Sequence, residues 1–166
     1  MRITTVEDVL KELGFEKAYG GEFKMKDSRG GTESIFCNQK SGIVIYLASL
    51  SNEVQHVRLY AEIKDDMRNP VYDECCYMEG KNVVHICQFV GISNSFKRNE
   101  IKLLLNSYLH KLDGITSKRW SIFPNMNFMD FRSPGDDQWD GDTSIITRAK
   151  IAEATDSLHR ILGISQ

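Results

Sequence analysis

Apolar residues recur every three or four positions over residues 95–114, which is the spacing of one face of an α-helix. The residues of this face are Ile101, Leu104, Leu105, Tyr108, Leu109 and Leu112. The other positions are mostly polar, Ser95 can cap the start of the helix, and Gly114 can supply a left-handed residue after its end. We therefore expect a helix here that covers a hydrophobic core.

Two further helices are predicted towards the ends of the chain. In the first, Thr4 or Thr5 caps the start and Gly14 ends the helix. The last runs from a capping residue at 142–143 to position 162. Their apolar sides are Val6, Val9, Leu10 and Leu13 in the first helix and Ile151, Ala154, Leu158, Ile161 and Leu162 in the last.

Between the first two helices the pattern changes to the two-residue period of β-strands. The clearest strand covers residues 54–64, where apolar and polar residues alternate, so we expect its polar face to be exposed to solvent. The strand over residues 43–50 is apolar on both faces and should be central. The strand over residues 33–38 is predicted to form a hairpin with 43–50 around a four-residue turn at 39–42. Other strands are predicted over residues 22–27, 71–78 and 83–90, with one or two more over 120–131, after the central helix.

This order of elements predicts an α+β fold. We expect a single antiparallel sheet of about six strands, with the N-terminal, central and C-terminal helices packed on one of its faces. The chain has 166 residues, of which 41% are hydrophobic and 27% charged, so it can bury one core without disulfide or metal staples. A single domain, 1–166, is expected.

Composition narrows the possible surroundings and partners. The net charge of −2 does not support binding to nucleic acid through a basic surface. The N-terminal residues contain no apolar run of signal-peptide length, and no run reaches the length of a membrane span. The adjacent pair Cys75 and Cys76, with Cys37 and Cys87, does not suggest a disulfide framework. We therefore expect a cytoplasmic protein that does not insert into a membrane.

A candidate metal site depends on the register of the hairpin formed by residues 71–78 and 83–90, which we predict to pair Met78 with Val83. This register brings four side chains of metal-ligand type onto one face, as two cross-strand pairs. Thiolate, imidazole and carboxylate groups suit zinc, although the usual spacing of paired cysteines is missing. Buried, reduced cysteines are the simpler interpretation, so we expect no cofactor, with zinc as the alternative. The pairs are Cys76 with His85 and Glu74 with Cys87.

Two other patterns relate to metal-dependent hydrolysis. Glu62 and Lys64 match the carboxylate-x-lysine pattern of nucleases, but Glu53, the nearest upstream acid, lies on the preceding turn. Residues 136–142 resemble a calcium-binding loop, yet the twelfth position, where a bidentate glutamate belongs, is Thr147. These patterns make a metal-dependent hydrolase or nuclease the alternative function. Because both matches are incomplete, we assign no catalytic residue.

A cluster of aromatic and methionine residues lies between positions 120 and 139. Such side chains suit a partner-binding surface of rigid anchors and adaptable thioethers, although a core position is the other interpretation. We expect a non-catalytic interaction module, such as an adaptor, inhibitor or immunity-like accessory protein, that binds a macromolecular partner or itself through this segment. Its candidate binding residues are Trp120, Phe123, Met126, Phe128, Met129, Phe131 and Trp139.

Overall fold

The computed structural model describes residues 1–24, 30–63, 75–80, 83–116, 153 and 156–163. In this part of the chain, no helix is long and apolar enough to cross a membrane. A C-terminal helix is described at residue 153 and residues 156–162. The other elements are α1 (Ile3–Glu12), β1 (Glu16–Lys24), β2 (Gly30–Asn38), β3 (Ile43–Leu50), β4 (Glu53–Ile63), β5 (Cys75–Gly80), β6 (Val83–Gly91) and α2 (Arg98–Asp113).

The six labelled strands form one antiparallel sheet in the order β1-β2-β3-β4-β6-β5. This confirms the predicted α+β fold with a single antiparallel sheet. Strand β3 lies inside the sheet, as its apolar residues on both faces predicted. The four-residue turn between β2 and β3 also has the predicted register, with Asn38 paired to Ile43.

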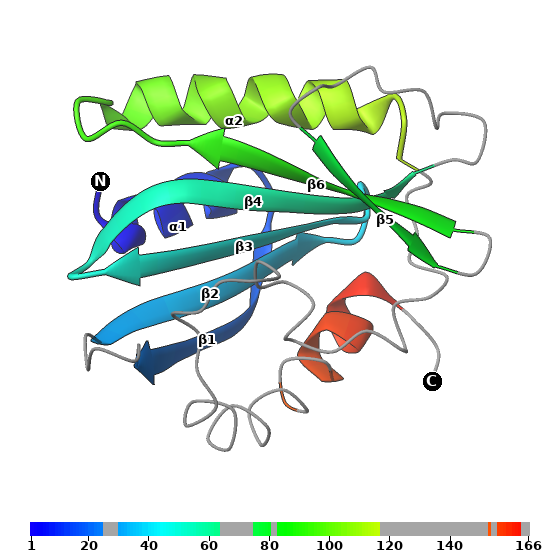
Figure 1. Ribbon diagram of the computed structural model, residues 1–166, viewed down its shortest axis with the longest axis horizontal. Coiled ribbons are helices and arrows are strands. Elements are labelled where there is room, and N and C mark those ends of the chain that lie inside the picture. The colour runs from blue at the N-terminus through cyan, green and yellow to red at the C-terminus, as the bar shows by residue number, and fades with distance from the viewer. Residues whose placement is uncertain (25–29, 64–74, 81–82, 117–152, 154–155, 164–166) are drawn as a thin grey trace.

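The sheet lies between helices on both of its faces, which corrects the prediction that all helices share one face. Figure 1 shows α1 behind the sheet and the C-terminal helix in front of it. Residues of α1 and α2 pack with Phe36, Ile45 and Leu59 in one hydrophobic cluster. Leu158 and Ile161 of the C-terminal helix pack in a second cluster on the opposite face. The predicted apolar sides of α1 and α2 are therefore confirmed, and so are Leu158, Ile161 and Leu162 of the C-terminal helix, whereas Ile151 and Ala154 lie outside the described residues. The placement of all helices on one face was wrong.

Three residues on the polar face of β4 are buried, contrary to the prediction that this face would be exposed to solvent, whereas His56 on the same face is exposed as predicted. Arg58 is 5% exposed, and Tyr60 and Glu62 are each 3% exposed. These residues lie on the same side of the sheet as the second cluster, which includes Tyr46 and Tyr60. Alternation along a strand separates its two faces, but it does not show what covers each face.

Helix α1 begins at Ile3 without the predicted threonine cap, and its N-cap residue is Arg2. The backbone N–H of Ile3 instead donates to the carbonyl of Asn52 at 2.9 Å, in the turn between β3 and β4. That turn therefore satisfies one of the backbone donors that have no partner within the helix. Gly14 ends the helix as predicted, with a φ of +91°.

Both predicted ends of α2 require correction. The helix is capped at Lys97, whose backbone N–H donates to the Glu100 carboxylate at 3.1 Å, while the hydroxyl of Ser95 bonds that of Ser93 at 2.8 Å. Gly114 has a φ of −73° and is not left-handed. After it the backbone N–H groups of Ile115 and Thr116 donate to the carbonyl of Leu112 at 3.0 and 2.9 Å in a turn, and the Thr116 hydroxyl donates to the carbonyl of Glu62 at 3.1 Å. This bond fastens the end of the helix to β4.

Strand β1 begins six residues earlier than the strand predicted at 22–27. The six residues that the prediction missed, 16–21, end in Gly20 and Gly21 and have no regular alternation, so the periodicity did not reveal them. Pairing with β2 holds this edge strand in place, with an irregularity in register between Lys17 and Tyr19. Tertiary pairing therefore outweighs a weak local preference here.

Candidate functional site

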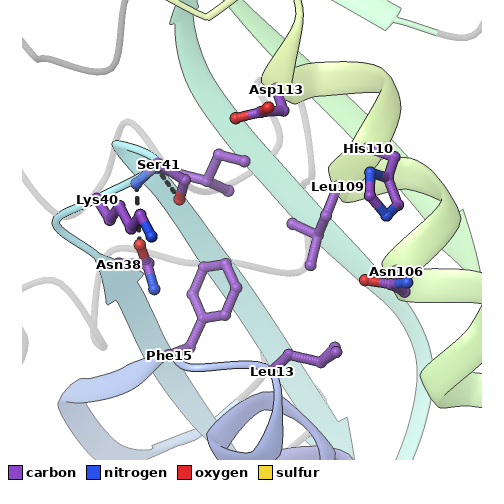
Figure 2. Close-up of a pocket in the computed structure, with 10 residues that line it drawn as sticks. Leu13, Phe15, Asn38, Lys40, Ser41, Asn106, Leu109, His110 and Asp113 are labelled. Atoms are coloured by element: carbon purple, nitrogen blue, oxygen red, sulfur yellow. Dashed lines mark hydrogen bonds between the residues drawn. The ribbon is translucent and has the colours of Figure 1, made fainter.

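A cleft of about 480 Å³ opens between the turn from β2 to β3 and the last two turns of α2. Figure 2 shows the turn on one side, α2 on the other, and Phe15 pointing into the space between them. A cleft of this volume is within the usual range for ligand pockets. Its lining residues are Leu13, Phe15, Asn38, Lys40, Ser41, Ile43, Asn106, Leu109, His110 and Asp113.

The floor of the cleft is apolar and is positioned by the end of α1. The backbone N–H of Phe15 donates to the carbonyl of Leu10 at 3.0 Å, and that of Gly14 to the carbonyl of Lys11 at 3.1 Å. This pair of bonds is a Schellman motif, which reverses the chain after a helix. It places Phe15, which is 6% exposed, next to Leu10 in the core and beneath the cleft.

One wall of the cleft is a turn that its own hydrogen bonds hold in shape. The Asn38 side chain donates to the carbonyl of Gly14 at 2.7 Å and accepts from the backbone N–H of Ser41 at 2.9 Å. The Ser41 hydroxyl oxygen in turn accepts from the backbone N–H of Ile43 at 3.3 Å. One side chain, Asn38, therefore ties the turn to the end of α1, so the wall and the floor have a fixed relation.

The other wall consists of residues on the surface of α2. Leu109 is half-buried and continues the apolar floor, whereas Asn106, His110 and Asp113 are exposed along the rim. Lys40 is exposed on the facing turn. The cleft thus combines an apolar floor with a polar rim that carries both signs of charge.

A second group of polar side chains is buried on the face that the C-terminal helix covers. The Tyr46 hydroxyl donates to the Glu33 carboxylate at 2.7 Å, and both residues are 1% exposed. The Arg58 guanidinium lies 5.5 Å from the ring centre of Tyr46 and 5.4 Å from that of Phe89, and its Nε donates to Nε2 of His56 at 3.3 Å. These bonds and ring contacts satisfy polar groups within the sheet and support a structural role.

Cys37 lies in the same covered layer and is fully buried. The pKa of its thiol is raised from 9.0 to about 12, mainly by burial and to a lesser extent by the negative charge of Glu16, while Arg160 opposes this change. A thiol with such a pKa is protonated at neutral pH, and the thiolate is the form that reacts and binds metal. Cys37 is therefore a packing residue.

The register predicted for the metal site is wrong by two residues. Met78 pairs with His85 rather than Val83, and Cys76 pairs with Cys87 rather than His85. The predicted ligand Glu74 lies outside the described residues. Within the described part of the chain, no group of three or more histidine, cysteine or acidic residues could hold a metal ion.

The structure describes only part of the remaining catalytic patterns. Glu62 is buried within β4 instead of lying on a solvated face, and its predicted partner Lys64 is outside the described residues. The calcium-like loop at 136–142 is outside them as well. His56 contacts Arg58 at the surface of the sheet, and His110 lines the cleft.

All seven predicted binding residues, from Trp120 to Trp139, lie outside the described residues. The cleft was not predicted, because its lining comes from three segments that are distant in the sequence. Leu109 was predicted only as part of the core-facing side of a helix, and residues 39–42 only as a turn. The nearest available signal was Gly14, since a glycine that ends a helix indicates where the chain changes direction.

Comparison with protein-family models, curated proteins and solved structures finds no match to this chain.

Proposed function

We propose that this protein is a non-catalytic interaction module, and that the cleft receives an apolar side chain of a polypeptide partner. The composition of the cleft carries the proposal. An apolar floor surrounded by a polar rim is typical of anchor pockets at protein interfaces. Phe15, Ile43 and Leu109 provide the floor, and exposed polar residues of the turn and of α2 provide the rim.

The rigidity of the cleft supports binding by a preformed surface. Hydrogen bonds from Asn38 join the turn to the end of α1, and the Schellman motif fixes Phe15. A surface that is ordered in advance loses less conformational entropy when a partner binds. This arrangement favours a rigid cleft that binds a flexible peptide segment. It does not favour a flexible site that folds around its ligand.

The chemistry of the rim supports binding rather than catalysis. Figure 2 shows Ser41 and His110 on opposite walls, and the Ser41 oxygen accepts from the backbone N–H of Ile43 at 3.3 Å. A catalytic serine needs a base within hydrogen-bond reach. We propose that these polar groups orient a partner, and that the aromatic segment at 120–139 provides a second contact with it.

Selection of phage-displayed random peptides on the immobilised protein tests this proposal. We expect enriched peptides to share a bulky apolar residue and to lose at least about tenfold in affinity on Leu109→Gln, as expected when about 1.4 kcal/mol of anchor contact is lost. The matched control is Leu103→Gln, since Leu103 lies on the same helix, is 71% exposed and does not line the cleft. Thermal unfolding checks that both variants are folded.

Two results would overturn the proposal. One is a selection that enriches no peptide, and the other is a set of peptides that bind Leu109→Gln as tightly as the unchanged protein. Sedimentation of the unchanged protein and of Leu109→Gln shows whether the partner is a second copy. Substituting Trp120 and Trp139 by alanine in the same binding assay tests the second contact.

A further inference from the structure

We propose that the partner group recognised by the cleft is the C-terminal end of a polypeptide, with an apolar last residue on the floor and its carboxylate against Lys40 and Ser41. This inference rests on the proposed function and names the chemistry of its partner. Three features of the turn support it. The turn presents hydrogen-bond donors, it carries the positive charge of Lys40, and Ile43 of the floor is only two residues from Ser41 in the sequence.

The turn wall presents hydrogen-bond donors to the cleft. Lys40 is exposed, and its ammonium group can only donate. The Ser41 oxygen already accepts from the backbone N–H of Ile43 at 3.3 Å, and its hydroxyl proton is not used in that bond. A carboxylate accepts hydrogen bonds and carries the opposite charge to Lys40, so it complements this wall.

The floor begins two residues from this wall. Ile43, the first residue of β3, is 1% exposed and comes two residues after Ser41, and Figure 2 shows Phe15 below Ser41. A C-terminal residue carries its carboxylate and its side chain on the same Cα atom. One residue can therefore place an apolar group on the floor and an anion against the turn, whereas an internal acidic residue needs an apolar neighbour for the same contacts.

Lys40 sets the orientation of the peptide. The wall that faces Lys40 and Ser41 in Figure 2 carries Asp113 of α2. Lys40 attracts a carboxylate, so the carboxylate should lie on the side of the turn. The preceding peptide then leaves the cleft along the exposed rim.

An NMR titration of the full-length protein with two synthetic peptides tests this inference. The peptides are N-acetyl-Gly-Ser-Gly-Phe with a free carboxylate and the same sequence with a C-terminal amide. We expect the acid to bind about tenfold more tightly than the amide, with amide shifts concentrated at residues that line the cleft. Lys40→Gln should remove most of this difference. Lys11→Gln is the matched control, because Lys11 is an exposed lysine that does not line the cleft.

Each other outcome overturns this inference in a distinct way. If acid and amide bind the cleft equally, the carboxylate contact is wrong and the proposed function stands. If neither binds while displayed peptides still depend on Leu109, the inference again fails alone. If octanoate shifts the same amides and neither peptide does, the site takes a lipid carboxylate instead. The proposed function itself fails only through the phage selection.

Discussion

Arg58 shows how a charged residue can be accommodated in a covered layer of the sheet. It is 5% exposed, and its guanidinium lies over the rings of Tyr46 and Phe89, at 5.5 and 5.4 Å from their centres. A guanidinium stacks on aromatic faces, and its apolar stem packs against neighbouring side chains. The aromatic residues on adjacent strands therefore make a buried position suitable for arginine.

The hydrogen bond from Tyr46 to Glu33 gives a prediction for this layer. Tyr46→Phe keeps the ring but removes the donor 2.7 Å from a carboxylate that is 1% exposed. We expect the free energy of unfolding to fall by about 1–3 kcal/mol, because a buried acceptor loses this partner. Urea denaturation at neutral pH measures the change.

A double-mutant cycle separates this bond from other effects of the substitution. In a Glu33→Gln background, Tyr46→Phe should cost less than it does alone, because the charged acceptor is already absent. Equal costs in the two backgrounds would show that the bond does not contribute to stability. The comparison is informative because both residues lie in the interior of the sheet on neighbouring strands.

At the residue scale, the sequence predicted which face of β4 each of residues 57–62 lies on, but it did not predict the burial of residues 58, 60 and 62. Residues 58, 60 and 62 lie opposite to residues 57, 59 and 61, as the alternation predicted. Their burial depends on partners from distant segments, such as Phe89 over Arg58 and Leu158 in the cluster with Tyr60. A local pattern contains no information about those partners.

Among the elements, the end of α1 has the clearest local cause. Gly14 has a φ of +91°, and its backbone N–H bonds the carbonyl of Lys11 at 3.1 Å. This left-handed residue turns the chain so that Phe15 enters the core and β1 can begin at Glu16. The geometry of the cleft floor therefore depends on one glycine.

Two alanine substitutions test this dependence. Gly14→Ala should lower the free energy of unfolding by about 1–2 kcal/mol, because a Cβ atom disfavours the left-handed conformation. Gly114→Ala is the matched control at the end of α2. Its φ is −73° and an added Cβ would meet no atom within 4 Å, so it should be neutral or stabilising by about 0.4–1 kcal/mol. Thermal and urea denaturation measure the change in the free energy of unfolding for each variant. Equal changes would show that the left-handed conformation at position 14 does not require glycine.

The ends and faces of elements were predictable to different degrees. The apolar face of α2 was predicted in full, because helix periodicity is local. The register of β5 and β6 was not, since a shift of two residues keeps every residue on its original face and leaves the hydrophobic pattern unchanged. The observed pairing of Gly80 with Val83 thus satisfies the same pattern as the pairing of Met78 with Val83.

For the molecule as a whole, the sheet has a hydrophobic cluster on each side. Helices α1 and α2 cover the larger cluster, and the C-terminal helix packs on the second. The cleft lies at one end of the first layer, where the β2–β3 turn, the end of α1 and α2 meet. Its position is a consequence of how three distant segments pack, so the amphipathic patterns predicted the core-facing sides of α1 and α2 but neither the cover on both faces of the sheet nor the cleft.

The C-terminal helix should be an integral part of the folded molecule. Leu158 is 2% exposed and packs in the cluster that contains Tyr46 and Tyr60, so Leu158→Ala should lower the free energy of unfolding by about 2–5 kcal/mol. Arg160→Ala, at an exposed position of the same helix, should change it by less than about 0.5 kcal/mol. Urea denaturation measures both variants. Similar small effects would mean that the helix does not cover this face in solution, and that β4 then exposes the polar side first expected from its sequence.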